Sequence, residues 1–269
     1  MTEDVTIEET PATKPKRGKR EPSPSQWNWV PRLFFRPKSI LSLVTAQEKP
    51  IWQKPFLILT LLVIIAVLVA APIRRMNVQM GANIPQDFQY WSDSDQQNFM
   101  QSQQSLTSPI FMYVFPILSE VAKYFIFWML FGSLLHLINT LAGSRANRQK
   151  FSNLTAWAML PFGLRLLVEI ITILISKKLV TQPGLSSLVT TDARGLLAFA
   201  RGILSQIDIY WVLFVAFVLL GAFPLSGLKR SKAVTATLVT VVIMLIILSI
   251  PSVLSAALSG VSTVRPFFY

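Results

Sequence analysis

Long apolar runs separated by short polar segments dominate the pattern of this chain. Each run comes close to the roughly 20 residues that a helix needs to cross the hydrocarbon core of a bilayer. The pattern therefore predicts an all-α, polytopic integral membrane protein with five transmembrane helices. We expect these spans at about residues 56–73, 111–137, 154–175, 209–225 and 233–258.

The composition agrees with this class. Apolar residues make up 52% of the 269 residues and charged residues 14%. Together with a mean hydropathy of +0.50, these values are too apolar for a soluble domain of this length. The chain has no cysteine, which excludes disulfides, thiolate metal sites and cysteine catalysis.

The basic residues are unevenly distributed about the predicted spans. Ten Lys and Arg precede the first span, three lie in each of the short loops after the second and fourth spans, and only seven fall on the other side. Because short basic loops stay in the cytoplasm, we expect a cytoplasmic N-terminus and an outer C-terminus. This bias also explains the net charge of +12 without a nucleic-acid partner.

The region before the first span divides into two parts, followed by the five-span membrane domain at 55–269. Residues 1–25 mix Thr, Glu, Pro and basic residues with few large apolar ones, which predicts a disordered, basic cytoplasmic tail. Residues 26–54 interleave aromatic and basic side chains, which is typical of an amphipathic helix in the headgroup layer. We expect contact with anionic headgroups at the cytoplasmic face through Trp27, Trp29, Arg32, Phe34, Phe35, Arg36 and Lys38.

The two longer loops on the outer side each predict a helix. In residues 74–109, Ser94 is a candidate N-cap. In residues 177–208, apolar residues recur at helical spacing after the candidate caps Thr191 and Asp192. The apolar residues of this second helix are Leu196, Phe199, Ile203 and Ile207.

Two predicted spans carry acid–base pairs within the membrane. Glu120 and Lys123 share one helix face at i,i+3, and Arg165 and Glu169 share another at i,i+4. If the two helices are antiparallel neighbours, the four charges meet at one depth as a neutral cluster. Such a cluster either fixes helix register or serves a substrate, ion or proton, because intramembrane charges are costly and usually functional.

Other residues in the spans predict how the helices bend and pack. Pro161 lies inside the third span and predicts a kink, because its missing N–H leaves a carbonyl without its helical partner. Ser252, Ala256 and Gly260 form a small-residue edge on the last helix, which predicts close contact with another helix.

Several short motifs are similar to a known family. They include the Arg36–Pro37 step before an apolar helix, the run Asp208–Trp211, and the basic turn Lys229–Ala233. In these features the chain resembles the bacterial branch of the Yip (Ypt-interacting protein) membrane family. The resemblance implies a five-span protein of the bacterial cell membrane, and it supplies no catalytic residues. The Asp-Leu-Tyr-Gly-Pro signature of the eukaryotic members, which associate with Rab GTPases, is not present.

No motif predicts an enzyme. The chain has no P-loop, no Gly-x-Ser-x-Gly elbow and no His or Cys pair at metal spacing, so we expect no catalytic residues, no metal and no cofactor. Its one histidine, His136, lies beside Ser133 and Asn139 and is more typical of a hydrogen-bonding residue than of a general base.

Two functions remain. The first is a membrane-organising scaffold that binds a protein partner in the membrane. This partner is either another protein or a second copy of the chain. The alternative is a small transporter or channel that uses the cluster of Glu120, Lys123, Arg165 and Glu169. Five spans do not divide into two equal inverted repeats, which favours the scaffold.

Overall fold

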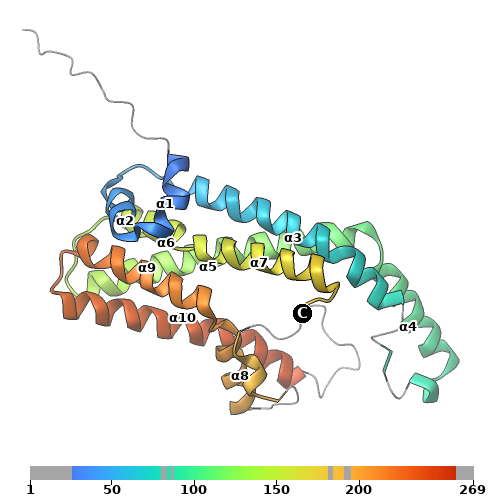
Figure 1. Cartoon of the computed structure of the whole chain (residues 1–269). Helices are drawn as coiled ribbons and strands as arrows, with labels where there is room; N and C mark the ends of the chain where they lie inside the picture. The colour runs from blue at the N-terminus through green and yellow to red at the C-terminus, as the bar shows by residue number, and fades with distance from the viewer. Residues whose placement is uncertain (1–25, 80–83, 86–87, 181–183, 191–194, 259–269) are drawn as a thin grey trace, which may run out of the picture.

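The computed structural model describes residues 26–79, 84–85, 88–180, 184–190 and 195–258, and all regular structure in these ranges is helical (Figure 1). The predicted tail at 1–25 and Gly260 lie outside the described residues. The α-helices are α1 (Trp29–Phe35), α2 (Pro37–Ala46), α3 (Gln53–Gln79), α4 (Asp93–Leu106), α5 (Phe115–Leu141), α6 (Arg148–Ala158), α7 (Leu160–Ser176), α8 (Leu196–Gln206), α9 (Ile209–Ser226) and α10 (Arg230–Leu258). Short helical turns occur at Gln26–Asn28, Phe88–Tyr90, Ile110–Val114 and Ser186–Leu188.

Five helical segments in the described chain are long and apolar enough to cross a membrane, which confirms the number of spans predicted. Most of them extend beyond the apolar runs, because a helix continues through flanking polar residues until a cap or turn ends it. The segments are Gln53–Val78, Ile110–Leu141, Arg148–Ser176, Ile209–Ser226 and Arg230–Ser255.

The third span is two helices rather than one. α6 ends at Ala158, Met159 serves as the junction, and α7 begins at Leu160 with Pro161 in its first turn. Proline is tolerated there because the first N–H groups of a helix have no intrahelical acceptor. The helix is thus interrupted at Met159, two residues before the proline at which a kink was predicted.

α6 is the central element of the bundle. It packs against α2, α5 and α9, and its residues Phe151, Leu154 and Trp157 are fully buried. α9 approaches it closely at Gly221, where an added Cβ would overlap the Leu154 side chain. A glycine at this position therefore permits the contact between α6 and α9.

Aromatic rings fill the space beside α6. Phe214 on α9 lies at the centre of this group, with ring centroids 4.8 Å from Phe131, 5.2 Å from Phe162 and 5.4 Å from Phe127. Edge-to-face and offset arrangements of this kind are favourable beyond the apolar area that they bury. The interior of the bundle at this level is closed by side chains.

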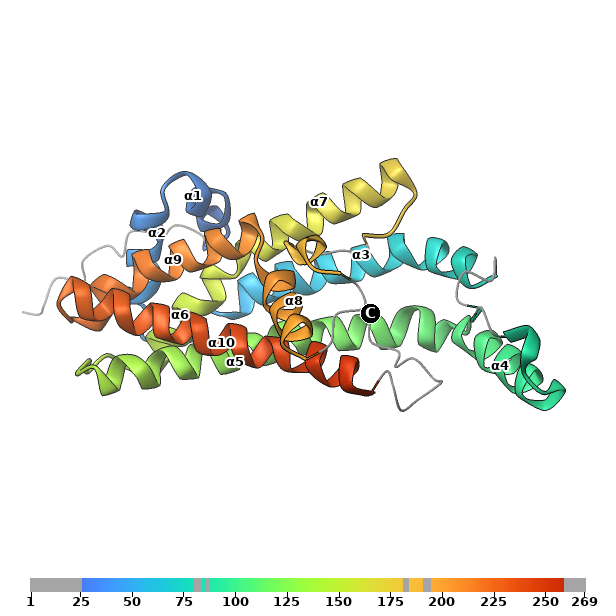
Figure 2. The ribbon, with the colours of Figure 1, turned by 90° about the horizontal axis from the view of Figure 1, so that it is seen from below.

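The connections separate toward the two ends of the bundle. The α1–α2 hairpin, the α5–α6 turn and the α9–α10 turn lie at one end, and α4 lies at the other (Figures 1 and 2).

The helix predicted in each long loop is confirmed as α4 and α8. Ser94 is not the cap of α4; Ser92 is, and its hydroxyl accepts a hydrogen bond from the Asp95 N–H.

Candidate functional site

The first predicted acid–base pair forms within α5. Lys123 Nζ lies 2.6 Å from Glu120 Oε2, and the two side chains are 60% and 41% exposed. The i,i+3 spacing places them on one helix face, as predicted. The pair therefore projects from the surface of the bundle rather than into its interior.

The second predicted pair is replaced by a different one. Arg165 Nη1 lies 3.2 Å from Asp208 Oδ2, and the two side chains are partly buried. Asp208 is also the N-cap of α9, because its Oδ1 accepts a hydrogen bond of 2.8 Å from the Trp211 N–H. The sequence analysis missed this role, although an acid directly before an apolar run is a typical cap signal.

The four predicted charges do not form one mutually paired cluster. The second and third spans are neighbours, as predicted, since α5 packs on α6 and Phe127 on α5 contacts Phe162 on α7. Arg165 on α7 nevertheless pairs with Asp208 and not with a charge on α5. Glu169 has no ion-pair partner among the described residues. Tyr124 on α5, one residue from Lys123, lies beside α7, with its ring centroid 6.3 Å from that of Phe162.

Of the aromatic residues near the N-terminus, some are buried in the protein and others are exposed on its surface. Trp29 is 5% exposed and its ring lies 5.5 Å from that of Trp157, so most of this side chain packs within the protein. Phe34 is partly covered by Phe217 at 6.0 Å. Trp27 and Phe35 remain exposed, as do Arg32, Arg36 and Lys38.

A buried polar junction joins α2, α3 and α6, and the sequence analysis missed it. Asn153 on α6 is fully buried. Its Oδ1 accepts hydrogen bonds from the Ile51 N–H at 3.0 Å and from Gln149 Nε2 at 3.1 Å. Its Nδ2 donates to the Lys49 carbonyl at 2.9 Å and, more weakly, to the Gln47 carbonyl at 3.4 Å. The linker that carries the chain from α2 to α3 is thus held by one side chain.

Two neighbouring interactions reinforce this junction. Trp157 Nε1 donates a 3.2 Å hydrogen bond to the Ile51 carbonyl, and Lys150 Nζ lies 3.8 Å from Glu48 Oε1. The linker at residues 47–52 is too short to have a periodicity from which such contacts can be predicted. Asn153 lies among other polar residues of α6, so the sequence does not distinguish it.

The small-residue edge of α10 packs on α8. An added Cβ at Gly202 would lie 2.9 Å from Ser252 Oγ and 3.1 Å from the Ser249 Cβ. The predicted helix contact is confirmed for Ser252, with α8 as the partner. Nothing is described of the Ala256 side chain, and Gly260 lies outside the described residues.

The remaining candidate, His136, lies beside Thr140 and Phe151. His136 Nδ1 lies 3.5 Å from the Thr140 hydroxyl, and its ring lies 5.5 Å from that of Phe151. Within the described ranges, no three His, Cys, Asp or Glu residues gather as a metal ion would require. In comparisons with known proteins, no family model, no curated protein and no solved structure matches this chain.

Proposed function

We propose that this multi-pass membrane protein is a non-enzymatic scaffold that binds a partner helix within the bilayer through α5. The observation that carries the proposal is the low burial of this span. Only 22% of the most apolar stretch of Ile110–Leu141 is buried in the protein, against 39% to 50% for the other four spans. A helix that its own bundle covers so little has a face available for another helix.

The charges on this face favour a protein partner over lipid alone. Glu120 and Lys123 are the half-exposed pair of α5, and a charge in the hydrocarbon costs about 2.5 to 3.5 kcal/mol. A partner that offers an acid and a base at the same depth lowers this cost. A second copy of the chain does so by symmetry, because Glu120 of each copy can meet Lys123 of the other.

Because the chain has no cysteine, a single introduced cysteine is the only thiol available for a cross-linking test. Ile126 lies one turn from Lys123 and is 49% exposed, and Leu68 on α3 is a matched control at 50%. We expect Ile126→Cys to form a disulfide-linked dimer on mild oxidation in native membranes and Leu68→Cys not to do so. We also expect Glu120→Gln with Lys123→Gln to reduce the dimer yield several-fold.

Two results would separate the outcomes. Cross-linking of Ile126→Cys to a different membrane protein would keep the scaffold and exclude self-association. If Ile126→Cys stays monomeric, and adding Glu120→Gln with Lys123→Gln leaves the cross-linking yield unchanged, the proposed role of α5 is overturned.

A transporter is the second candidate, and the ion pair of Arg165 with Asp208 among the membrane spans favours it. Glu169 lies one turn from Arg165 on α7 and has no ion-pair partner among the described residues. However, the contacting rings of Phe127, Phe162 and Phe214 fill the interior nearby, so transport requires another conformation. Flux in proteoliposomes that Glu169→Gln abolishes without a loss of stability would support this alternative and contradict a purely structural role.

The resemblance to the Yip family agrees with the scaffold proposal, since the family's eukaryotic members are five-span proteins that associate with Rab GTPases. By the same resemblance we propose the bacterial cell membrane as the location. The basic turns and the α1–α2 hairpin share one end of the bundle, which supports a cytoplasmic assignment for that end.

A further inference from the structure

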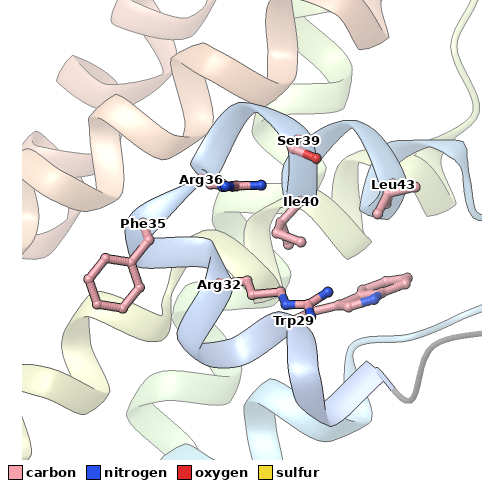
Figure 3. A pocket seen from close by; sticks show the side chains of 7 residues that line it. All are labelled: Trp29, Arg32, Phe35, Arg36, Ser39, Ile40 and Leu43. Carbon is pink, nitrogen blue, oxygen red and sulfur yellow. The ribbon is translucent and has the colours of Figure 1, made fainter.

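A cavity lies in the angle between α1 and α2. Its volume is about 430 Å³, within the range of small-molecule sites, and it is lined by Trp29, Arg32, Phe35, Arg36, Ser39, Ile40 and Leu43. Figure 3 shows the Arg32 and Arg36 side chains extending into the space between the two helices, whereas Phe35 points outward at the rim.

The cations of the cavity are not neutralised by the protein. Residues 26–46 contain no Asp or Glu, and neither Arg32 nor Arg36 forms an ion pair with any residue that the structure describes. Two guanidinium groups on the same small cavity repel each other unless an anion lies between them. Arginine presents a planar fork of donors that matches a phosphate or carboxylate.

Two further donors are unsatisfied. Trp29 is 5% exposed, yet its Nε1 has no hydrogen-bond partner in the described structure. A buried N–H of this kind normally finds an acceptor. α2 begins at Pro37 with no side-chain cap, so the N–H groups of its first turn near Ser39 are also without helical acceptors and favour an anion.

The rim of the cavity is apolar. Phe35 is 86% exposed and Leu43 is 42% exposed, which is unusual beside two arginines on a water-facing surface. A ligand that has a phosphate and a hydrocarbon part can pair with the arginines and also contact the apolar side chains of the rim. The exposed apolar rim favours a lipid over a free phosphate ion.

We propose that the α1–α2 cavity binds the phosphate of one anionic lipid. Arg32 and Arg36 pair with the phosphate oxygens, Trp29 Nε1 donates to the headgroup, and Phe35 and Leu43 contact the start of the acyl chains. The sequence predicts contact between this segment and anionic headgroups; the geometry adds a site for a single lipid. The site does not depend on partner binding by α5.

The test uses native mass spectrometry of the purified full chain, with phosphatidylglycerol and phosphatidylcholine as probes. Wild type is expected to retain one phosphatidylglycerol in preference to phosphatidylcholine. Arg32→Gln and Arg36→Gln each weaken this binding by about tenfold, the loss of a charge-assisted hydrogen bond. Trp29→Phe weakens it several-fold while keeping the aromatic contact with Trp157.

Lys38→Gln is the matched control. It removes the same charge from the same segment, but Lys38 does not line the cavity, so binding should change less than twofold. Equal losses for Lys38→Gln and Arg36→Gln, or equal retention of the two lipids by wild type, would overturn the proposal in favour of diffuse surface attraction. Saturation by inorganic phosphate with no lipid retained would assign the cavity to a soluble phosphate and refute the lipid.

Circular dichroism checks that each variant keeps its helical content. Arg32 and Arg36 are exposed, so their replacement leaves the core intact. If Trp29→Phe fails to fold, the two arginine variants and Lys38→Gln still decide the outcome.

Discussion

Replacing Asn153 with leucine tests whether the polar junction holds the α2–α3 linker. Leucine has a similar volume, so the packing around α6 is kept while the hydrogen bonds of the amide are lost. The Ile51 N–H is then left without an acceptor in a residue that is 7% exposed, which costs about 1 to 3 kcal/mol. Lys49 is exposed, so water replaces its bond at a further cost of about 1 kcal/mol or less.

We therefore expect Asn153→Leu to destabilise the protein by about 1 to 4 kcal/mol. For a domain of this size, this loss corresponds to an apparent melting temperature lower by roughly 2 to 16 °C. The assay is loss of helical circular dichroism on heating in detergent. Hydrogen exchange of a peptide that covers Ile51 gives a local readout, and exchange should be faster in the variant.

Asn139 provides the matched control. It is also fully buried, but its Oδ1 has no hydrogen-bond partner and its Nδ2 donates only to the Leu135 carbonyl one turn away. Asn139→Leu removes an unsatisfied acceptor and leaves no new one, so stability should stay level or rise by up to about 1 kcal/mol. An Asn153→Leu variant as stable as wild type, or an equal loss in Asn139→Leu, would refute the reasoning.

Two further predictions concern the charges and the orientation. Asp208→Asn should keep the cap on the Trp211 N–H and lose the ion pair with Arg165. Asp208→Ala should lose both, so its stability should be lower by a further 1 kcal/mol or so. Equal melting temperatures for the two variants would mean that the cap contributes nothing. Single cysteines at Lys229 and Asp93 should be labelled by an impermeant thiol reagent in intact cells only at position 93, and the reverse pattern would invert the topology.

The predicted cluster of four charges shows why the contacts between helices were not predictable in detail. In a soluble protein the apolar face of a helix marks its packing side, but in a bilayer both the packed side and the lipid-facing side are apolar. Phe127 is buried and Phe125 is exposed on the same helix, and nothing in their residue type distinguishes them. The meeting of Arg165 and Glu169 with the charges of α5 was therefore assumed from chain order, and the structure pairs Arg165 with Asp208 instead.

Local rules determined much of this protein from its sequence alone. The lengths of the apolar runs set five membrane-crossing helices, Pro161 indicated an interruption of the third, and helical spacing predicted α8, because each depends only on residues close together in the chain. Only the tertiary structure decided that Trp29 is buried against Trp157, that Arg165 pairs with Asp208, and that Asn153 holds a linker about a hundred residues away. These contacts depend on which helices become neighbours, and that choice follows from side-chain packing, which has no periodic signal in the sequence.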